Sequence, residues 1–124
     1  MSDDVLEDRI RCELPHFNPE QVHELRLIIE RLVAALAPER IYVFGSQARG
    51  EATDGSDIDL LMVVPAADRP AHRLAQQAYH AAAPHSLALD VLVMPHEEFV
   101  RRSRAVASLP ATVLREGKVL YAAA

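Results

Sequence analysis

Hydrophobic residues recur along this chain with two different periods, one typical of helices and one typical of strands. Between residues 19 and 36 they return every three or four positions, which predicts an amphipathic helix packed on a core. Asn18 is a favourable N-cap for this helix, Pro19 suits its first position, and Gln21 stands where a capping box requires it. Pro38 ends the helix, because proline cannot continue it.

Short apolar runs without helical spacing predict the strands of a sheet. Each run is rich in β-branched or aromatic residues and has glycine, proline or polar residues close by, which is typical of buried strands. The predicted strands are residues 41–44, 57–64 and 87–94, with residues 118–121 as a shorter edge strand.

Helical spacing returns in three further segments. The predicted helices are residues 3–13, where the pattern is weak and Pro15 would stop it, residues 68–83, and a stretch from Pro95 through Arg115. One side of the second of these carries Leu74, Ala75, Ala78, Tyr79 and Ala82. This order of elements predicts an α/β (α+β) fold, in which a small mixed β-sheet is flanked by helices in two layers.

Length and composition favour one structural domain. The chain has 124 residues, half of them hydrophobic, and we expect residues 1–38 to form an N-terminal helical segment packed on a domain of residues 39–124.

The net charge of −5 argues against direct DNA binding. The longest apolar run, residues 60–64, is far shorter than the roughly 20 residues of a membrane helix. A lone cysteine, Cys12, fits a reducing compartment, so we expect a cytoplasmic protein without membrane contact.

Three aspartates stand where a structural role is hard to find. Asp57 and Asp59 lie two residues apart in a predicted strand, so both side chains face one side of the sheet. Asp90 lies within an apolar strand, where a charge is costly unless it is paired or binds a metal. If the two strands are neighbours, the three carboxylates converge and repel each other until a divalent cation neutralises them. Oxygen ligands of this kind select Mg²⁺ or Mn²⁺.

A loop directly before this acidic pair has chemistry of its own. Three of the four glycines, Gly45, Gly50 and Gly55, fall within it, so backbone freedom is concentrated in one short segment. Backbone N–H groups at Gly45 and the Ser46 hydroxyl can hold a phosphate where the preceding strand ends. Arg49 can supply a planar, charged fork to phosphate oxygens.

The spacing of these residues resembles a known family. Gly45-Ser46, ten further residues and Asp57-Ile58-Asp59 have the form GSx₁₀DxD. The longer string GSQARGEATDGSDIDLLMVV resembles the minimal nucleotidyltransferases (MNT) of the DNA polymerase beta-like superfamily. The resemblance spans roughly residues 40–121. The short chain and its closing LREGKVLY are similar to the antitoxins of MNT/HEPN toxin–antitoxin pairs.

The resemblance implies a polymerase beta-like nucleotidyltransferase fold and a role for each acidic residue. Asp57 and Asp59 would bind two Mg²⁺ ions, one of which also holds the β- and γ-phosphates of the nucleotide. Asp90 would complete the second metal site and help to activate the acceptor hydroxyl. Gly45 and Ser46 would hold the triphosphate.

The resemblance also implies a reaction and a partner. Members of this kind transfer AMP from ATP to a tyrosine of a HEPN ribonuclease toxin, a separate protein, and so silence it; here Arg49 would contact a phosphate of the ATP. Two alternatives stay open at this point. The chain could be a non-catalytic antitoxin that neutralises its partner by binding, or an adenylyltransferase for small molecules of the aminoglycoside kind, although those enzymes normally carry a further helical domain.

Overall fold

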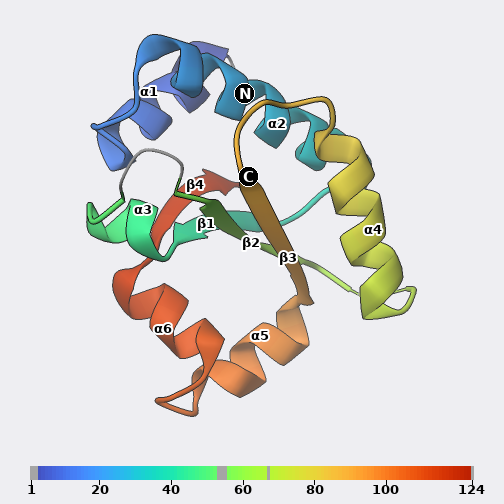
Figure 1. The fold of residues 1–124 in the computed structure, drawn as a ribbon. Helices are drawn as coiled ribbons and strands as arrows, with labels where there is room; N and C mark the ends of the chain where they lie inside the picture. Colours follow the sequence, from blue (N-terminus) through green and yellow to red (C-terminus); the bar gives the residue numbers. More distant parts are fainter. Residues whose placement is uncertain (1–2, 53–55, 67, 124) are drawn as a thin grey trace.

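A four-stranded sheet runs through the middle of the molecule with helices on both of its faces (Figure 1). The computed structural model describes residues 3–52, 56–66 and 68–123, so Gly55 lies outside the described residues. The elements are α1 (Asp3–Glu13), α2 (Pro19–Leu36), β1 (Arg40–Phe44), α3 (Ser46–Arg49), β2 (Ile58–Val64), α4 (Ala71–Ala82), β3 (Leu89–Pro95), α5 (His96–Ser103), α6 (Leu109–Glu116) and β4 (Lys118–Ala122).

The sheet has the order β3-β2-β1-β4 and mixes two kinds of pairing. β1 runs antiparallel to both β2 and β4, whereas β2 and β3 are parallel and are connected through α4. The predicted small mixed sheet flanked by helices is therefore confirmed. In the described part of the chain, no helix is long and apolar enough to cross a membrane.

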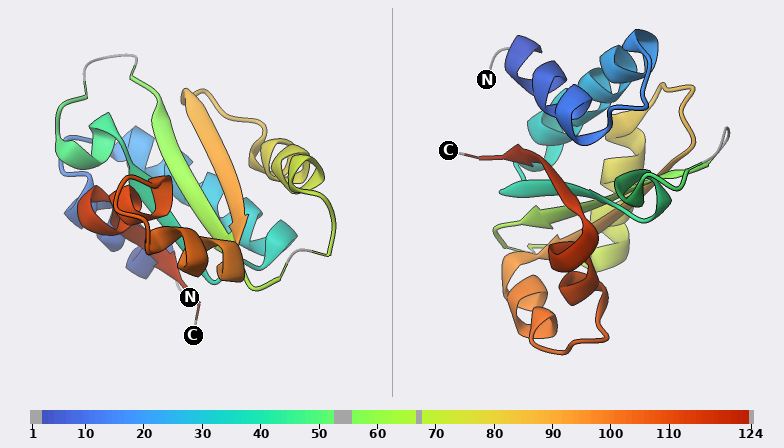
Figure 2. Two further views of the ribbon diagram at one scale, coloured as in Figure 1. Left: turned by 90° about the horizontal axis from the view of Figure 1, so that it is seen from below. Right: turned by 90° about the vertical axis from the view of Figure 1, so that its left-hand side faces the viewer.

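Strand β2 lies in the centre of the fold and is apolar on both sides. Leu60 and Met62 join the core beneath α1, α2 and α4, whereas Leu61 and Val63 join a second core with Phe99 of α5. Figure 2 shows α1 and α2 on one side of the sheet and α5 and α6 on the other. The fold therefore has three layers, and the two-layer prediction is wrong because the strand buries both of its faces.

Helix α2 begins and ends at the predicted residues. The Asn18 side chain accepts a hydrogen bond from the Gln21 backbone N–H at 2.8 Å, and the Gln21 side chain accepts one from the Asn18 N–H at 2.9 Å. This reciprocal capping box satisfies two N–H groups that the first turn would otherwise leave free. At the other end Ala37 adopts a left-handed conformation and closes the helix before Pro38.

Two helical predictions differ from the structure. Helix α4 begins only at Ala71, because Pro70 takes the N-cap position, and Tyr79 is 66% exposed instead of packing on the core. The stretch from Pro95 through Arg115 is divided into α5 and α6. Ser108 causes the break, since its hydroxyl caps α6 by accepting a hydrogen bond from the Ala111 N–H.

An ion-pair cluster joins α1 to α2. Arg26 is only 8% exposed and binds Glu7 of α1 at 2.5 Å and also Glu30 of its own helix. The hydrogen bond from Arg26 holds the pKa of Glu7 below its ordinary value, although burial acts in the opposite direction. The cluster therefore attaches α1 to α2, while the division of the chain at residue 38 stays a prediction.

This cluster predicts a pH-dependent contribution to stability. Because the pKa of Glu7 is lower in the folded than in the unfolded chain, its contribution is complete above pH 4.5 and is lost as the pH falls through the folded-state pKa. We expect Glu7→Gln to have a lower free energy of unfolding than the wild type at pH 7. In acid, we expect the two proteins to have the same free energy of unfolding. Urea unfolding over a pH series measures this, with Glu97→Gln on the exposed face of α5 as control. A difference in the free energy of unfolding that persists unchanged at acidic pH would contradict the assignment of this contribution to the ionised Glu7 carboxylate.

Candidate functional site

Two of the predicted site residues lie opposite each other at one edge of the sheet. Because β2 and β3 are parallel neighbours, Asp59 pairs in register with Asp90. Paired positions on neighbouring strands are about 4.8 Å apart and point to the same face. Asp57 stands one residue before β2, so the strand begins slightly later than predicted. The structure thus brings together the acids that the sequence placed on separate strands.

Electrostatic repulsion connects the three acids. The pKa of Asp59 is raised above its ordinary value, first by its burial and then by the negative charges of Asp90 and Asp57. The positive charge of Arg49 acts in the opposite direction. Asp57 and Asp90 are exposed, whereas Asp59 is half-buried. The site is therefore an acidic cluster open to solvent, and a bound cation would relieve its repulsion.

The chemistry of this donor set suits a hard divalent cation. Carboxylate oxygens are the ligands that Mg²⁺ and Mn²⁺ prefer, and Asp57, Asp59 and Asp90 would hold such an ion. Among residues 3–52, 56–66 and 68–123, no three side chains of His, Cys, Asp or Glu lie close enough as they stand to hold a metal ion. The three aspartates therefore lie in one cluster, but their carboxylates do not form a complete set of metal ligands.

The turn at Gly45 lies directly against one of these acids. Gly45 has a φ of +73°, and a Cβ built on it would stand 2.5 Å from Asp59 Oδ2. The short helix α3 follows at Ser46 and ends at Gly50, which also has a positive φ of +71°. The half-buried Ser46 thus begins the helix beside the acidic cluster, as the GSx₁₀DxD spacing predicts.

Arg49 ends α3 on the solvent side of the site. Its guanidinium Nε lies 3.2 Å from the Glu51 carboxylate, and the side chain is 40% exposed. Its charge still reaches Asp59, because it counteracts the rise of the pKa there. Its role as a phosphate contact stays a prediction.

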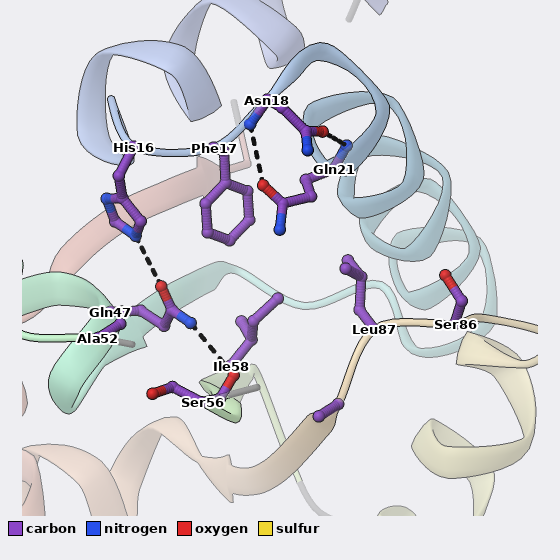
Figure 3. Close-up of a pocket in the computed structure, with 11 residues that line it drawn as sticks. His16, Phe17, Asn18, Gln21, Gln47, Ala52, Ser56, Ile58, Ser86 and Leu87 are labelled. Carbon is purple, nitrogen blue, oxygen red and sulfur yellow. Dashed lines mark hydrogen bonds between the residues drawn. The ribbon is translucent and has the colours of Figure 1, made fainter. Parts of the chain in front are cut away.

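Gln47 is the residue that the sequence analysis overlooked. It is one of the ten spacer residues of the motif, yet it is only 7% exposed and makes two side-chain hydrogen bonds. It borders a cavity of about 500 Å³ beneath the motif (Figure 3). Ile58 also borders this cavity and faces away from Asp57 and Asp59, since neighbouring residues of a strand alternate. The cavity therefore lies on the other face of the sheet from the acids.

The mixed sheet thus presents in-register acids beside a glycine–serine turn. The chain belongs to the nucleotidyltransferase domain family, whose family model matches residues 22–119.

Two solved structures are similar to this chain. A protein from Sulfolobus solfataricus, assigned as a nucleotidyltransferase, is 26% identical with a TM-score of 0.50, over 63% of this chain and 75% of that chain. A toxin–antitoxin structure with AMP-PNP is 24% identical with a TM-score of 0.45, over 77% of this chain and 72% of that chain. No curated protein matches the chain significantly.

Proposed function

We propose that the protein transfers a nucleoside monophosphate, AMP from ATP, to a hydroxyl acceptor in a Mg²⁺-dependent reaction. The observation that carries this proposal is the in-register pair of Asp59 and Asp90 beside the Gly45 turn. An acidic pair at this position, in a chain of the nucleotidyltransferase family, has a direct use in phosphoryl chemistry. Bound divalent cations neutralise charge on the phosphates and on the attacking oxygen.

Each residue of the site contributes a separate part of the reaction. Asp57 and Asp59 hold the cations, together with Asp90. The Ser46 hydroxyl donates a hydrogen bond to a phosphate oxygen, and Gly45 leaves room for that phosphate because it has no side chain. When the nucleotide binds, the Arg49 guanidinium leaves the Glu51 carboxylate and binds the triphosphate instead.

Asp90, whose side chain is exposed, has the role of proton acceptor. It accepts the hydroxyl proton as the acceptor oxygen bonds to the α-phosphorus and the bond to the β-phosphate breaks, so pyrophosphate leaves. Positioning and charge neutralisation supply most of the rate.

The acceptor we propose is a tyrosine of a cognate HEPN ribonuclease toxin, which makes the protein an antitoxin. The GSx₁₀DxD string and the closing LREGKVLY support this choice by their similarity to MNT antitoxins. The two alternatives are a non-catalytic antitoxin that only binds its partner and an adenylyltransferase that modifies a small molecule.

Transfer of label from α-phosphate-labelled ATP tests the proposal. The purified chain is incubated with Mg²⁺ and a lysate of its source cell, or with the product of the neighbouring gene, and the labelled residue is identified by mass spectrometry. We expect label on a tyrosine of a small helical protein and none with the Asp57→Asn/Asp59→Asn variant.

Two other outcomes would each overturn a different part of the proposed function. Label on a small molecule alone would replace the toxin as acceptor. A stable complex with the partner and no label in any fraction would remove the transferase activity and favour the binding antitoxin.

A further inference from the structure

Gln47 connects three separate segments of the chain. Its Nε2 donates a hydrogen bond to the backbone carbonyl of Ser56 at 3.3 Å, and its Oε1 lies 2.7 Å from His16 Nε2 (Figure 3). An amide oxygen can only accept, so His16 must carry its proton on Nε2 and donate it. The side chain therefore ties α3 to the residues before β2 on one side and to the turn between α1 and α2 on the other.

This connection joins the two halves of the sequence motif. Gln47 follows Ser46, the predicted phosphate contact, and Ser56 precedes Asp57, the first predicted metal ligand. Strands β1 and β2 are paired as far as Phe44 opposite Asp59, whereas Ser46 and Asp57 both lie beyond this last pair. The Gln47 side chain supplies a short cross-link between the two halves.

Backbone hydrogen bonds hold each half, and the pairing of β1 with β2 joins the two halves as far as Phe44 and Asp59. The Glu51 N–H donates to the Ser46 carbonyl at 3.0 Å and so closes α3. The Ile58 N–H donates to the Ala88 carbonyl at 2.8 Å and so fixes the start of β2 against β3. Beyond that strand pair, the Gln47 side chain is the cross-link that joins α3 to Ser56, the residue before Asp57.

We infer that Gln47 is a positioning residue of the transferase site, which holds the phosphate-binding turn at a fixed distance from Asp57, and that His16 in turn orients its amide. This inference rests on the proposed function. Gln47 itself faces the opposite side of the sheet from the acids and touches no substrate. It acts through the relative placement of Ser46 and Asp57, that is, of the phosphate chain and the cations.

The inference predicts a loss of rate without a comparable loss of nucleotide binding. Gln47→Met keeps the length and volume of the side chain but removes both hydrogen bonds. We expect kcat to fall by about 10- to 100-fold, the effect of a small misplacement of reacting groups, with KM for ATP changed less than threefold. His16→Ala should lower kcat to a smaller extent, and His16→Gln should restore it because glutamine can still donate to Gln47 Oε1.

A matched control is available on α4. Gln77 also donates its side-chain N–H to a backbone carbonyl, that of Ala35 at 3.1 Å, but it lies away from the acidic cluster. Gln77→Met therefore loses a bond of the same kind without touching the motif. We expect its kcat to equal that of the wild type.

Hydrogen exchange supplies a measurement that does not depend on transferase activity. In Gln47→Met we expect faster exchange of the Arg49 and Glu51 amides, which close α3, and unchanged exchange in α2 and β1. This result would stand even if the wild type transferred no nucleotide, so failure of the proposed function and failure of the cross-link can be distinguished. Wild-type exchange in α3, or a kcat for each folded molecule equal to that of Gln77→Met, would overturn the inference.

Discussion

Replacing Asp59 with asparagine should abolish nucleotidyl transfer and, at the same time, stabilise the fold. The loss of activity is expected to reach at least about a thousandfold, as when one member of a catalytic unit is removed. The gain in stability follows from the repulsion within the cluster. Burial and the charges of Asp90 and Asp57 raise the pKa of Asp59, so the folded chain favours its uncharged form.

The sign of the pH dependence follows from this pKa. A carboxyl whose pKa is raised on folding costs stability when it is ionised, and that cost appears as the pH rises from the ordinary value of 3.8 through the folded-state pKa. An asparagine side chain carries no charge at any pH, so Asp59→Asn should melt a few degrees above the wild type at pH 7 and at the same temperature in acid.

Thermal unfolding over a pH series, together with the label-transfer assay, measures both effects. Asp68→Asn is the matched control, because Asp68 is exposed and its pKa is lowered by the hydrogen bond from Arg69. This control should keep full activity and gain no stability at pH 7. An Asp59→Asn protein that melts below the wild type would show that the carboxylate is a structural partner instead of a member of a repelling cluster.

The elements that sequence patterns predicted well are those that local chemistry determines. The ends of α2 depend on Asn18, Gln21 and Pro38, which act within one turn of the chain. The convergence of Asp59 and Asp90 required one additional assumption, that their strands are neighbours. An apolar strand on each side of a helix made that arrangement the natural one, since parallel neighbours need such a crossover.

The features that the sequence did not show depend on contacts between distant segments. Tyr79 fits the apolar side of its helix by spacing, yet it is exposed to solvent in the folded chain. Gln47 became recognisable only when the turn before α2 brought His16 beside it, 31 positions away. The sequence does contain one indication of the third layer. The unbroken apolar run of β2 is typical of a strand that is covered on both faces.

Gly45→Ala should remove most of the activity of the folded protein. The new Cβ would stand 2.5 Å from Asp59 Oδ2, well inside contact distance. The atom it meets is the end of a side chain that can rotate, so the clash moves the carboxylate instead of unfolding the chain. A displaced carboxylate no longer meets the cation and the phosphates in the reactive geometry, and we expect transfer to fall by about a hundredfold or more.

Gly50→Ala is the control for a substitution at a positive φ whose Cβ meets no neighbour. Gly50 has a φ of +71° and a ψ of 19°, in the left-handed region, and a Cβ there would meet nothing within 4 Å. Gly45 has a φ of +73° and a ψ of −153°, a conformation essentially restricted to glycine. Gly50→Ala should therefore lose about 1–2 kcal/mol, the cost of a side chain in the left-handed region, and Gly45→Ala should lose more, as measured by urea unfolding. Only Gly45→Ala should lose transfer activity. Equal activities in the two variants, each measured for the folded molecule, would mean that the contact between the turn and Asp59 has no part in the reaction.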